Sequence, residues 1–372
     1  MEKSFIVDQK SLLNLLASMQ PICSKRTALD ATANILFHVG HKELVLKSTD
    51  LEISLQASCS LLESTLEKAH SFLVSGRRIW EVIKELEGPI ACTITHHQLS
   101  LQAGDVNLAL NIKDAQEFPP FPERIENLMH FDAPLLRKML ESVAFLIPQS
   151  NANSALNGLL LEIAQNALTM TTTDGHCLAQ VSCSLSSFNE TRTWLLPRRA
   201  IFELKKIIET CQDTTLFLGV CGNQLVFSGE LFNFFTKLLA DQFPNYRTIL
   251  DKEAFLPATL ERSRFIKTLR RSACLLSNQF IATKFSFNGN MLQVSMQNKE
   301  VGTLDEQMPL LNGSGACVDI RFYAPYLLSG LQAFSDSDIT FYLKSSTTPI
   351  IFESTGGGYR MTYLVMPISP TS

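Results

Sequence analysis

The chain has 372 residues, of which 45% are hydrophobic and 18% are charged, and its formal net charge is −4 at pH 7. This composition is typical of a globular protein with enough apolar side chains for two or three domain cores. No run of eighteen apolar residues occurs, and the first residues lack a basic segment followed by an apolar one. The sequence therefore predicts neither a membrane span nor export.

The cysteines and histidines do not form the patterns of a disulfide framework or a metal site. The nine cysteines are odd in number, and no two of them are spaced as C-x-x-C. His96-His97 is predicted to be a hairpin tip, and His38 and His41 flank a turn at Gly40. We therefore expect reduced, mostly buried thiols in a cytoplasmic protein, without a metal or a cofactor.

The first third of the chain is predicted to contain two amphipathic helices, at 8–20 and 77–87. Apolar residues recur there at positions i, i+3, i+4 and i+7, which is the spacing of one helix face. A strand at 72–74 precedes the second helix, and the segments 91–95 and 98–101 follow it as a predicted hairpin.

The other two thirds repeat this order. Helices are expected at 135–147 and 197–209 in the middle third, and at 261–277 and 319–334 in the last third. Hairpins are expected at 216–220 with 224–227, and at 339–343 with 349–352. Each third ends with an aromatic residue or methionine before a proline, and these prolines, spaced by 125 and then 123 residues, are Pro119, Pro244 and Pro367. A period near 124 predicts three copies of one unit, at 1–127, 128–254 and 255–372.

Each copy is expected to hold two helices and about eight short strands. Two helices cannot cover both faces of that many strands. We therefore predict an α+β fold of three tandem domains, in which the two helices of each domain pack together on one side of antiparallel sheets.

Residues 171–179 are predicted to form a threonine-rich strand that ends in a tight turn at Asp174-Gly175. A carboxylate can orient an imidazole that acts as a base, so Asp174 and His176 could serve a hydrolase. Alternatively, Asp174-Gly175 only turns the chain and His176 caps the wall of a pocket. A similar pattern at 48–52, and the lack of a nucleophile motif or a phosphate-binding glycine loop, favour the turn. We expect no catalytic residue.

The predicted helices are basic, whereas the rest of the chain is acidic. The six helices contain sixteen lysine and arginine residues and nine aspartate and glutamate residues, a net charge of +7, which leaves −11 for the remainder. A solvated helix face explains any one of these helices but not the division as a whole. Helices that share one surface would suit the phosphate backbone of a nucleic acid. Stacking aromatics do not interleave with the basic residues, so sequence-specific or single-strand recognition is not expected.

The threefold repeat occurs together with four motifs, Leu156-Asn157-Gly158, Thr173-Asp174-Gly175-His176, Phe243-Pro244-x-Tyr246-Arg247 and Tyr363-Leu364-Val365-Met366-Pro367. In this combination the whole chain resembles the bacterial DNA polymerase III beta subunit, the sliding clamp. The resemblance implies a head-to-tail homodimeric ring of six similar domains, with helices around double-stranded DNA and sheets at the rim. It implies a replication processivity factor without catalytic activity, located in the bacterial cytoplasm at the nucleoid. A monomeric DNA-binding protein of the same fold is the remaining alternative.

The resemblance also implies partners and site residues. A clamp loader, DNA polymerase subunits and repair proteins would bind through short hydrophobic motifs. The partner-peptide pocket would be lined by Leu156, Thr173, Gly175, His176, Leu178, Pro244, Ile249, Tyr326, Pro349, Leu364, Met366, Pro367 and Ile368. The DNA-contacting residues would include Arg26, Arg198, Arg199, Arg270 and Arg271. The dimer interface would join Leu108 and Leu110 to Leu275 and Leu276 of the second copy.

Four positions of the pocket depart from the family pattern. Cys177, Thr248 and Ser369 stand where the family commonly carries arginine, and Asn153 replaces a usual basic residue. These changes leave the apolar positions intact and remove positive charge from the rim.

Overall fold

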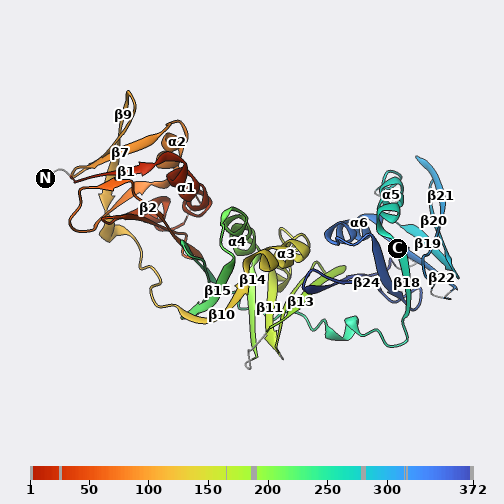
Figure 1. Cartoon of the computed structure of the whole chain (residues 1–372). Coiled ribbons are helices and arrows are strands. Elements are labelled where there is room, and N and C mark those ends of the chain that lie inside the picture. Colours follow the sequence, from red (N-terminus) through yellow and green to blue (C-terminus); the bar gives the residue numbers. More distant parts are fainter. Residues whose placement is uncertain are drawn as a thin grey trace. The chain divides into compact units, whose positions relative to one another are not determined.

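The computed structural model describes residues 3–24, 27–164, 166–185, 191–277, 282–313, 315 and 317–368. Figure 1 shows these residues with their helices and strands labelled. By their internal contacts they divide into two compact units. The first unit comprises Met1–Pro134 and Phe202–Leu238, and the second comprises Leu135–Ile201 and Leu239–Ser372. Each unit contains helices packed on antiparallel sheets, which confirms the predicted fold class.

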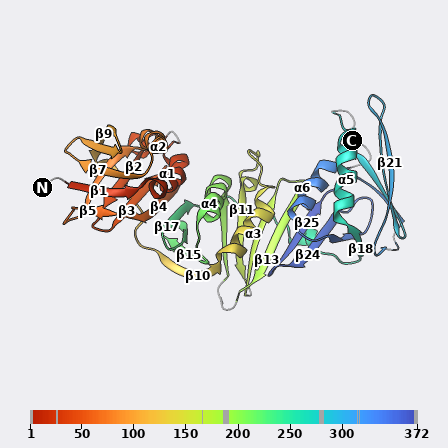
Figure 2. The same cartoon turned by 45° about the horizontal axis from the view of Figure 1, so that its top comes forward.

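In the first unit, helices α1 (Gln9–Cys23) and α2 (Gly76–Lys84) pack against each other and on the strands beneath them (Figure 2). The strands of its sheet follow one another across the sheet in the order β10 (Glu126–Asp132), β15 (Thr215–Cys221), β16 (Gln224–Ser228), β17 (Phe232–Lys237), β4 (Ile53–Ser60), β3 (Glu43–Thr49), β2 (Asn34–Val39), β6 (His70–Ser75), β9 (Val106–Asp114), β8 (Gln98–Ala103), β7 (Pro89–Ile94), β1 (Lys3–Asp8) and β5 (Glu63–Ser64). Two short 3-10 helices, η1 (Asp30–Ala33) and η2 (Ala115–Glu117), lie in the connections.

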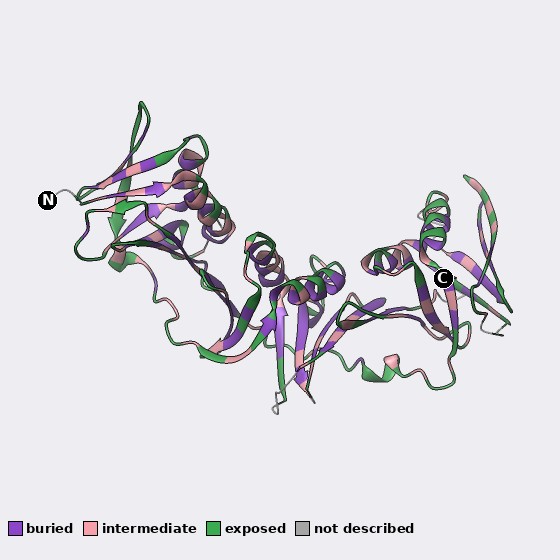
Figure 3. Cartoon of the chain, in the orientation of Figure 1, coloured by how far each residue is buried: buried purple, intermediate pink, exposed green. Residues whose placement is uncertain are grey.

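Helix α1 shows how the sequence positions these elements. It begins after Asp8, whose carboxylate accepts hydrogen bonds from the backbone N–H (3.0 Å) and the hydroxyl (2.9 Å) of Ser11. Its buried residues include Leu12, Leu16 and Met19, which recur at helical spacing on the side that contacts β3 and β4. Figure 3 shows the same separation of buried from exposed residues, with buried residues on the strands and on the inner sides of the helices.

The second unit contains helices α5 (Arg262–Ala273) and α6 (Ala324–Ala333) and all but the first two residues of α3 (Ala133–Ala144), and helix α4 (Arg198–Thr210) begins in it. One sheet has the order β14 (Arg192–Pro197), β11 (Gly158–Ala164), β12 (Ala167–Thr173), β13 (Cys177–Ser184), β25 (Tyr359–Val365), β24 (Ile350–Gly356), β23 (Asp338–Leu343) and β18 (Leu256–Glu261). A second sheet has the order β21 (Gly302–Pro309), β20 (Met291–Asn298), β19 (Thr283–Asn288) and β22 (Cys317–Phe322). Helices α5 and α6 pack against each other, as α1 and α2 do in the first unit.

Five of the six helices begin within two residues of their predicted starts, and the last does not. The segment 319–334 was predicted to be one helix, but Cys317–Phe322 is strand β22 and the helix begins at Ala324. The reason is Pro325, which fits the first turn of a helix, where its missing N–H has no partner to lose. No helix in the described part of the chain combines the length and the apolar character needed to cross a membrane.

Candidate functional site

The turn between β12 and β13 is held by its own side chains. The backbone N–H groups of His176 (2.8 Å) and Cys177 (2.7 Å) donate to Oδ1 of Asp174. The hydroxyl of Thr173 donates to the carbonyl of Cys177 (2.6 Å) and accepts from the N–H of Gly175 (3.1 Å). Gly175 has φ +95°, a conformation that glycine adopts without steric cost.

The same turn recurs in the other two thirds of the chain. Oδ1 of Asp50 accepts from the N–H groups of Glu52 (2.9 Å) and Ile53 (2.8 Å). Oδ1 of Asn298 accepts from the N–H groups two and three residues further on, at 2.9 and 3.3 Å. Positions 50, 174 and 298 are spaced by 124 residues, which is the period found in the sequence. The carboxylate of Asp174 therefore belongs to a repeated structural turn.

These contacts argue against a catalytic pair at this turn. Oδ1 of Asp174 is bound to backbone N–H groups, and the imidazole of His176 stacks on the ring of Tyr326, with 5.5 Å between centroids and 19° between planes. The thiol of Cys177 is buried, and burial raises its pKa to about 12, so it is protonated at neutral pH and a poor nucleophile. Among the described residues of this turn, the hydrolase alternative finds neither an oriented base nor a nucleophile.

The C-terminal strand runs beside this turn. Strand β25 pairs with β13 and sets Leu364 opposite Leu178. The N–H of Met366 donates to the carbonyl of His176 (2.9 Å), which continues the pairing into the turn itself. The N–H of Ile368 donates to the carbonyl of Arg321 at 2.8 Å. The pairing of β25 with β13 therefore brings together residues that are almost two hundred positions apart in the sequence.

The predicted pocket residues divide into a buried set and an exposed set. Leu178 and Leu364 are each 1% exposed and belong to one core cluster, and Leu156 is 8% exposed. A Cβ added at Gly175 would lie 4.0 Å from Cδ1 of Leu156. Met366, by contrast, is 39% exposed and follows strand β25 directly. The surface that a partner could touch is therefore formed by the turn and by Met366, with the leucines beneath.

The remaining predicted lining residues lie in the same unit, on strand β12, helix α6, η4 (Arg247–Leu250) and the connecting loops. Thr173 and Tyr326 are half-buried, and Ile249 on η4 is 41% exposed. Pro244 is exposed, and the half-buried residues near the ends of β24 and β25 are Pro349, Pro367 and Ile368. The contacts that the structure records around the turn join Leu156, Gly175, His176, Tyr326 and Met366.

The described residues at the rim positions that depart from the family pattern are not positively charged. Thr248 is exposed, whereas Cys177 points into the core. Asn153 caps η3 (Ser154–Asn157), because its side-chain oxygen accepts from the N–H of Ala155 at 3.1 Å. Ser369 lies outside the described residues.

Two features near the turn were not identified from the sequence. The hydroxyl of Tyr246 and the guanidinium of Arg247 (2.9 Å) both donate to the carboxylate of Glu162, which holds the start of η4 against strand β11. Burial, and then Glu162, raises the pKa of the Tyr246 phenol. Tyr323 meets Tyr326 edge-on at 4.9 Å, so the aromatic wall continues beyond His176. Only the Tyr246-Arg247 motif signalled any of this in the sequence.

The predicted DNA-contacting arginines differ in what they bind. Arg26 lies outside the described residues. Nε of Arg198 donates to the carbonyl of Ile147 at 3.1 Å, and Arg199 is half-buried. Nε of Arg271 donates to Glu306 at 2.9 Å in a two-pronged ion pair, which neutralises much of its charge. Arg270 is exposed.

The helices as a group are more basic than predicted. Within their observed bounds the six helices hold fifteen lysine and arginine residues and four aspartate and glutamate residues, a surplus of eleven. The whole chain carries −4, so the rest carries −15. The predicted dimer residues also lie at accessible places: Leu108 on β9 is 40% exposed, and Leu110, Leu275 and Leu276 are half-buried.

Comparison with known proteins gives the same result along the whole chain. Family models of the DNA polymerase III beta subunit match residues 3–122 as the N-terminal domain, 131–245 as the central domain and 247–369 as the C-terminal domain. The beta sliding clamp of Pseudomonas putida is 25% identical over 368 residues, covering 98% of this chain and 99% of the relative. That of Chlamydia pneumoniae is 25% identical over 377 residues, covering 98% of each chain.

Solved structures share the fold. The DNA polymerase III subunit beta of Pseudomonas aeruginosa superposes with a TM-score of 0.89 at 23% identity, covering 98% of this chain and 99% of that one. The DNA polymerase sliding clamp of Bacillus subtilis gives 0.90 at 19% identity, covering 99% and 100%. A sliding clamp from Pseudomonas aeruginosa bound to griselimycin also gives 0.90, at 23% identity and with 99% and 100% covered. With three consecutive domain models matched over nearly all of its length, the chain belongs to the DNA polymerase III beta subunit family.

Proposed function

We propose that this chain is a DNA sliding clamp that serves a DNA polymerase and has no catalytic activity of its own. It would encircle duplex DNA as a homodimer and thereby keep the polymerase on its template. The proposed ring is supported by the pattern of paired and unpaired strand edges in the three repeats.

In two of the three repeats, the strand after the repeated turn pairs with a strand of the next third. Strand β4 pairs with β17, where Leu55 faces Phe234, and β13 pairs with β25, where Leu178 faces Leu364. The third strand of this kind, β21, pairs only with β20 among the described residues. Strand β9 corresponds to β17 and β25 as the last hairpin strand of its third, and its residues 106–111 pair only with β8 in the described chain.

Two complementary free edges on one chain suit a head-to-tail dimer. Unpaired edges invite association, and pairing β21 of each copy with β9 of the other would close a ring and leave neither edge free. Leu108 and Leu110 would then meet Leu275 and Leu276 of the second copy. The exposure of Leu108 and the position of the other two leucines directly after α5 support this contact.

The dimer is tested by changing Leu275→Ala together with Leu276→Ala and measuring sedimentation over a range of protein concentrations. Loss of a central apolar anchor costs about 2 kcal/mol or more, so the dimer dissociation constant should rise at least about thirtyfold. The matched control is Leu62→Ala with Leu231→Ala, two exposed leucines on other loops. An unchanged dimer in the 275/276 variant would exclude this interface.

Binding to DNA would be topological, with weak contacts to the phosphates. The basic surplus of the helices gives non-specific attraction that weakens steeply as salt rises. Arg270, which is exposed, is a better candidate for such contacts than Arg271, because the guanidinium of Arg271 is held by Glu306. Protein loaded on circular DNA should stay bound in high salt and dissociate after the circle is cut. Equal retention on circular and linear DNA would instead favour the monomeric DNA-binding protein.

The turn at Thr173–Cys177 would be the wall of a groove for partner peptides. Gly175 leaves the backbone accessible, His176 and Tyr326 form an aromatic side, and Met366, at the end of β25, is the exposed apolar anchor. A clamp loader, polymerase subunits and repair proteins would insert short hydrophobic motifs there. Because Cys177, Thr248 and Ser369 replace arginines, acidic residues in the ligand should be tolerated less well than by relatives.

Titration of a labelled hydrophobic clamp-binding peptide tests this groove. Met366→Ala should weaken binding about thirtyfold, the effect of losing a central anchor of about 2 kcal/mol. Asp174→Asn should change it little, because Asn298 makes the same turn in the third repeat. A hydrolase would give the opposite pattern, with turnover lost at Asp174 and Met366 silent.

The domain bounds and the location in the cell complete the proposal. Domains at 1–127, 128–254 and 255–372 are supported by the three matched stretches, whose gaps fall at 123–130 and at 246. A place in the bacterial cytoplasm, at the nucleoid during replication, is supported by the bacterial sources of the relatives.

A further inference from the structure

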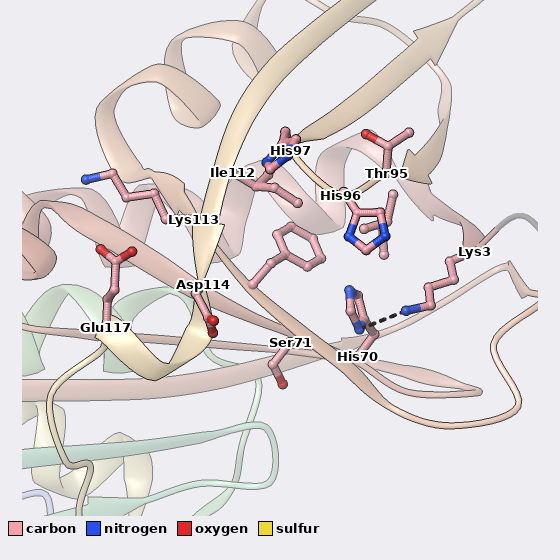
Figure 4. A pocket seen from close by; sticks show the side chains of 12 residues that line it. Lys3, His70, Ser71, Thr95, His96, His97, Ile112, Lys113, Asp114 and Glu117 are labelled. Carbon is pink, nitrogen blue, oxygen red and sulfur yellow. Dashed lines mark hydrogen bonds between the residues drawn. The ribbon is translucent and has the colours of Figure 1, made fainter.

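Three of the seven histidines line one hollow of the first unit. His70, His96 and His97 line it, and His38 bonds through Nδ1 to the hydroxyl of Ser71 (2.8 Å), another lining residue. The hollow has a volume of about 770 Å³ and is formed by β1, β6, the β7–β8 turn and the end of β9 (Figure 4).

One end of the hollow is rich in donor nitrogens. The ammonium of Lys3 lies 3.3 Å from Nδ1 of His70 and can only donate, so the imidazole accepts there and carries its proton on Nε2. Burial, then Lys3, then His96 lower the pKa of His70. Figure 4 shows the Lys3–His70 pair with the ring of His96 close by. These groups repel further positive charge, and a bound anion would relieve that repulsion.

A metal ion does not suit this end. Zinc and similar ions need three or four nitrogen, sulfur or carboxylate ligands, and Lys3 already occupies the lone pair of His70 with a positive group. The described residues contain no group of three or more histidine, cysteine or acidic side chains arranged to hold a metal ion. The chemistry that remains is an oxyanion, for which lysine and imidazole N–H groups are suitable donors.

The rest of the hollow offers apolar and acidic groups. Phe72 (2% exposed) and Ile94 (6% exposed) form its floor, and Ile112 is half-buried beside them. Asp114 and Glu117 are exposed carboxylates that Figure 4 shows on the side away from Lys3. A flat group over the floor could donate amino or hydroxyl hydrogens to these carboxylates. The volume lies within the range of small-molecule sites.

We propose that this hollow binds a nucleoside phosphate, with the phosphates at Lys3, His70 and His96 and the base over Phe72 and Ile112. The site lies within the first unit, goes beyond the clamp function and does not depend on it. It would give the protein a small-molecule ligand that is separate from its DNA and its peptides.

Binding should strengthen as the pH falls, because protonation of His70 adds positive charge at the phosphate end. The titratable and charged groups that line the hollow beside His70 are Lys3 on β1, His96 and His97 on the β7–β8 turn, Lys113 and Asp114 on β9, and Glu117 on η2, and His38 on β2 bonds to Ser71.

The test uses the full chain with ¹³C-labelled histidine and follows the imidazole signals by NMR, assigned with single His→Gln variants. The probes are ADP, pyrophosphate and adenosine. ADP should move the His70 and His96 signals and raise the titration midpoint of His70. It should bind about tenfold tighter than pyrophosphate and more tightly still than adenosine, since both the charge and the base contribute.

Matched variants show where the ligand binds. Lys3→Met should weaken ADP binding about tenfold, the effect of removing one charged hydrogen bond. Lys42→Met removes the same charge from an exposed site elsewhere in the unit and should have no effect. His70→Gln keeps a neutral donor and should abolish the gain in affinity between pH 8 and pH 6, whereas His41→Gln should keep it. Three results would each overturn the proposal. The first is that ADP does not move the His70 and His96 signals. The others are that adenosine or pyrophosphate binds as tightly as ADP, or that the two lysine variants lose equal affinity.

Discussion

Helix α6 meets strand β25 at Gly330, where a missing side chain lets the helix approach the ring of Tyr363. A Cβ added at Gly330 would lie 1.9 Å from Cε1 and 2.1 Å from Cδ1 of Tyr363, whereas ordinary contacts begin near 3.4 Å. Tyr363 is 0% exposed, and its hydroxyl donates to the carbonyl of Tyr326 at 2.8 Å. Gly330→Ala must therefore displace either the ring or the helix.

The expected loss of stability is the balance of three contributions. Alanine in place of glycine stabilises a helix by about 1 kcal/mol. Overpacking of a close-packed core costs about 1–3 kcal/mol, and loss of the Tyr363–Tyr326 hydrogen bond costs about 1 kcal/mol more. The displacement of roughly 1.5 Å needed to restore ordinary contact favours the upper part of this range. Gly330→Ala should therefore destabilise the C-terminal third by about 2–3 kcal/mol.

Hydrogen exchange of peptides from α6 and β25 measures this locally, which matters because a chain of several domains need not unfold in one step. Ser329→Ala is the control: it is exposed, and its hydroxyl only bonds back to the carbonyl of Pro325. The double variant Gly330→Ala with Tyr363→Leu should lose less than the sum of the single losses, because removing the ring removes the clash. Unchanged protection in Gly330→Ala would refute the packing argument.

Two further predictions concern pH. Burial raises the pKa of the thiols of Cys92 and Cys177 to about 12, from 9.0, so the stability they contribute is complete below pH 9 and declines as the pH rises towards 12. Chemical denaturation from pH 8 to pH 11 should show a loss of up to about 1.4 kcal/mol per pH unit for each thiol, and a smaller slope in the cysteine-to-alanine variants. Burial raises the pKa of the Glu353 carboxyl, but the hydrogen bonds from Lys252 and Arg360 lower this pKa by more, so that it lies below the usual 4.5. This stabilisation is present above pH 4.5 and lost on acidification, so Glu353→Gln should be less stable than wild type at pH 7, and the difference should shrink by pH 3.

The fold was predictable because its signals are local and repeated. Amphipathic spacing located the helices, and the period near 124 revealed three copies that the turns at Asp50, Asp174 and Asn298 now show in detail. The one wrong helix start came from extending the apolar spacing across Pro325, although proline near the start of a helix marks its first turn. Local chemistry thus took precedence over periodicity there.

The site was less predictable because it depends on pairing between distant segments. An apolar pattern in β13 and β25 indicates one buried face, but only the register of the two strands puts Leu178 and Leu364 in the core and leaves Met366 exposed. The gathering of His70 and His96 also needs strands that are not adjacent in the sequence. Sequence spacing contains no signal for such contacts.

The repeated turn suggests why a single groove would be present. The residue after the turn's Asp or Asn is Leu51 in the first repeat, with φ +74° and a side chain 41% exposed, and Gly175 in the second, with φ +95°. The same backbone therefore accepts leucine, and leucine fills the approach that glycine leaves open. Gly175→Leu should weaken binding of the clamp peptide at least tenfold while the protein stays folded, at a conformational cost of about 1–2 kcal/mol. Circular dichroism and peptide titration measure the two effects together, and Leu51→Gly is the control that should leave peptide binding unchanged. Wild-type affinity in folded Gly175→Leu would mean that partners do not approach the backbone at this turn.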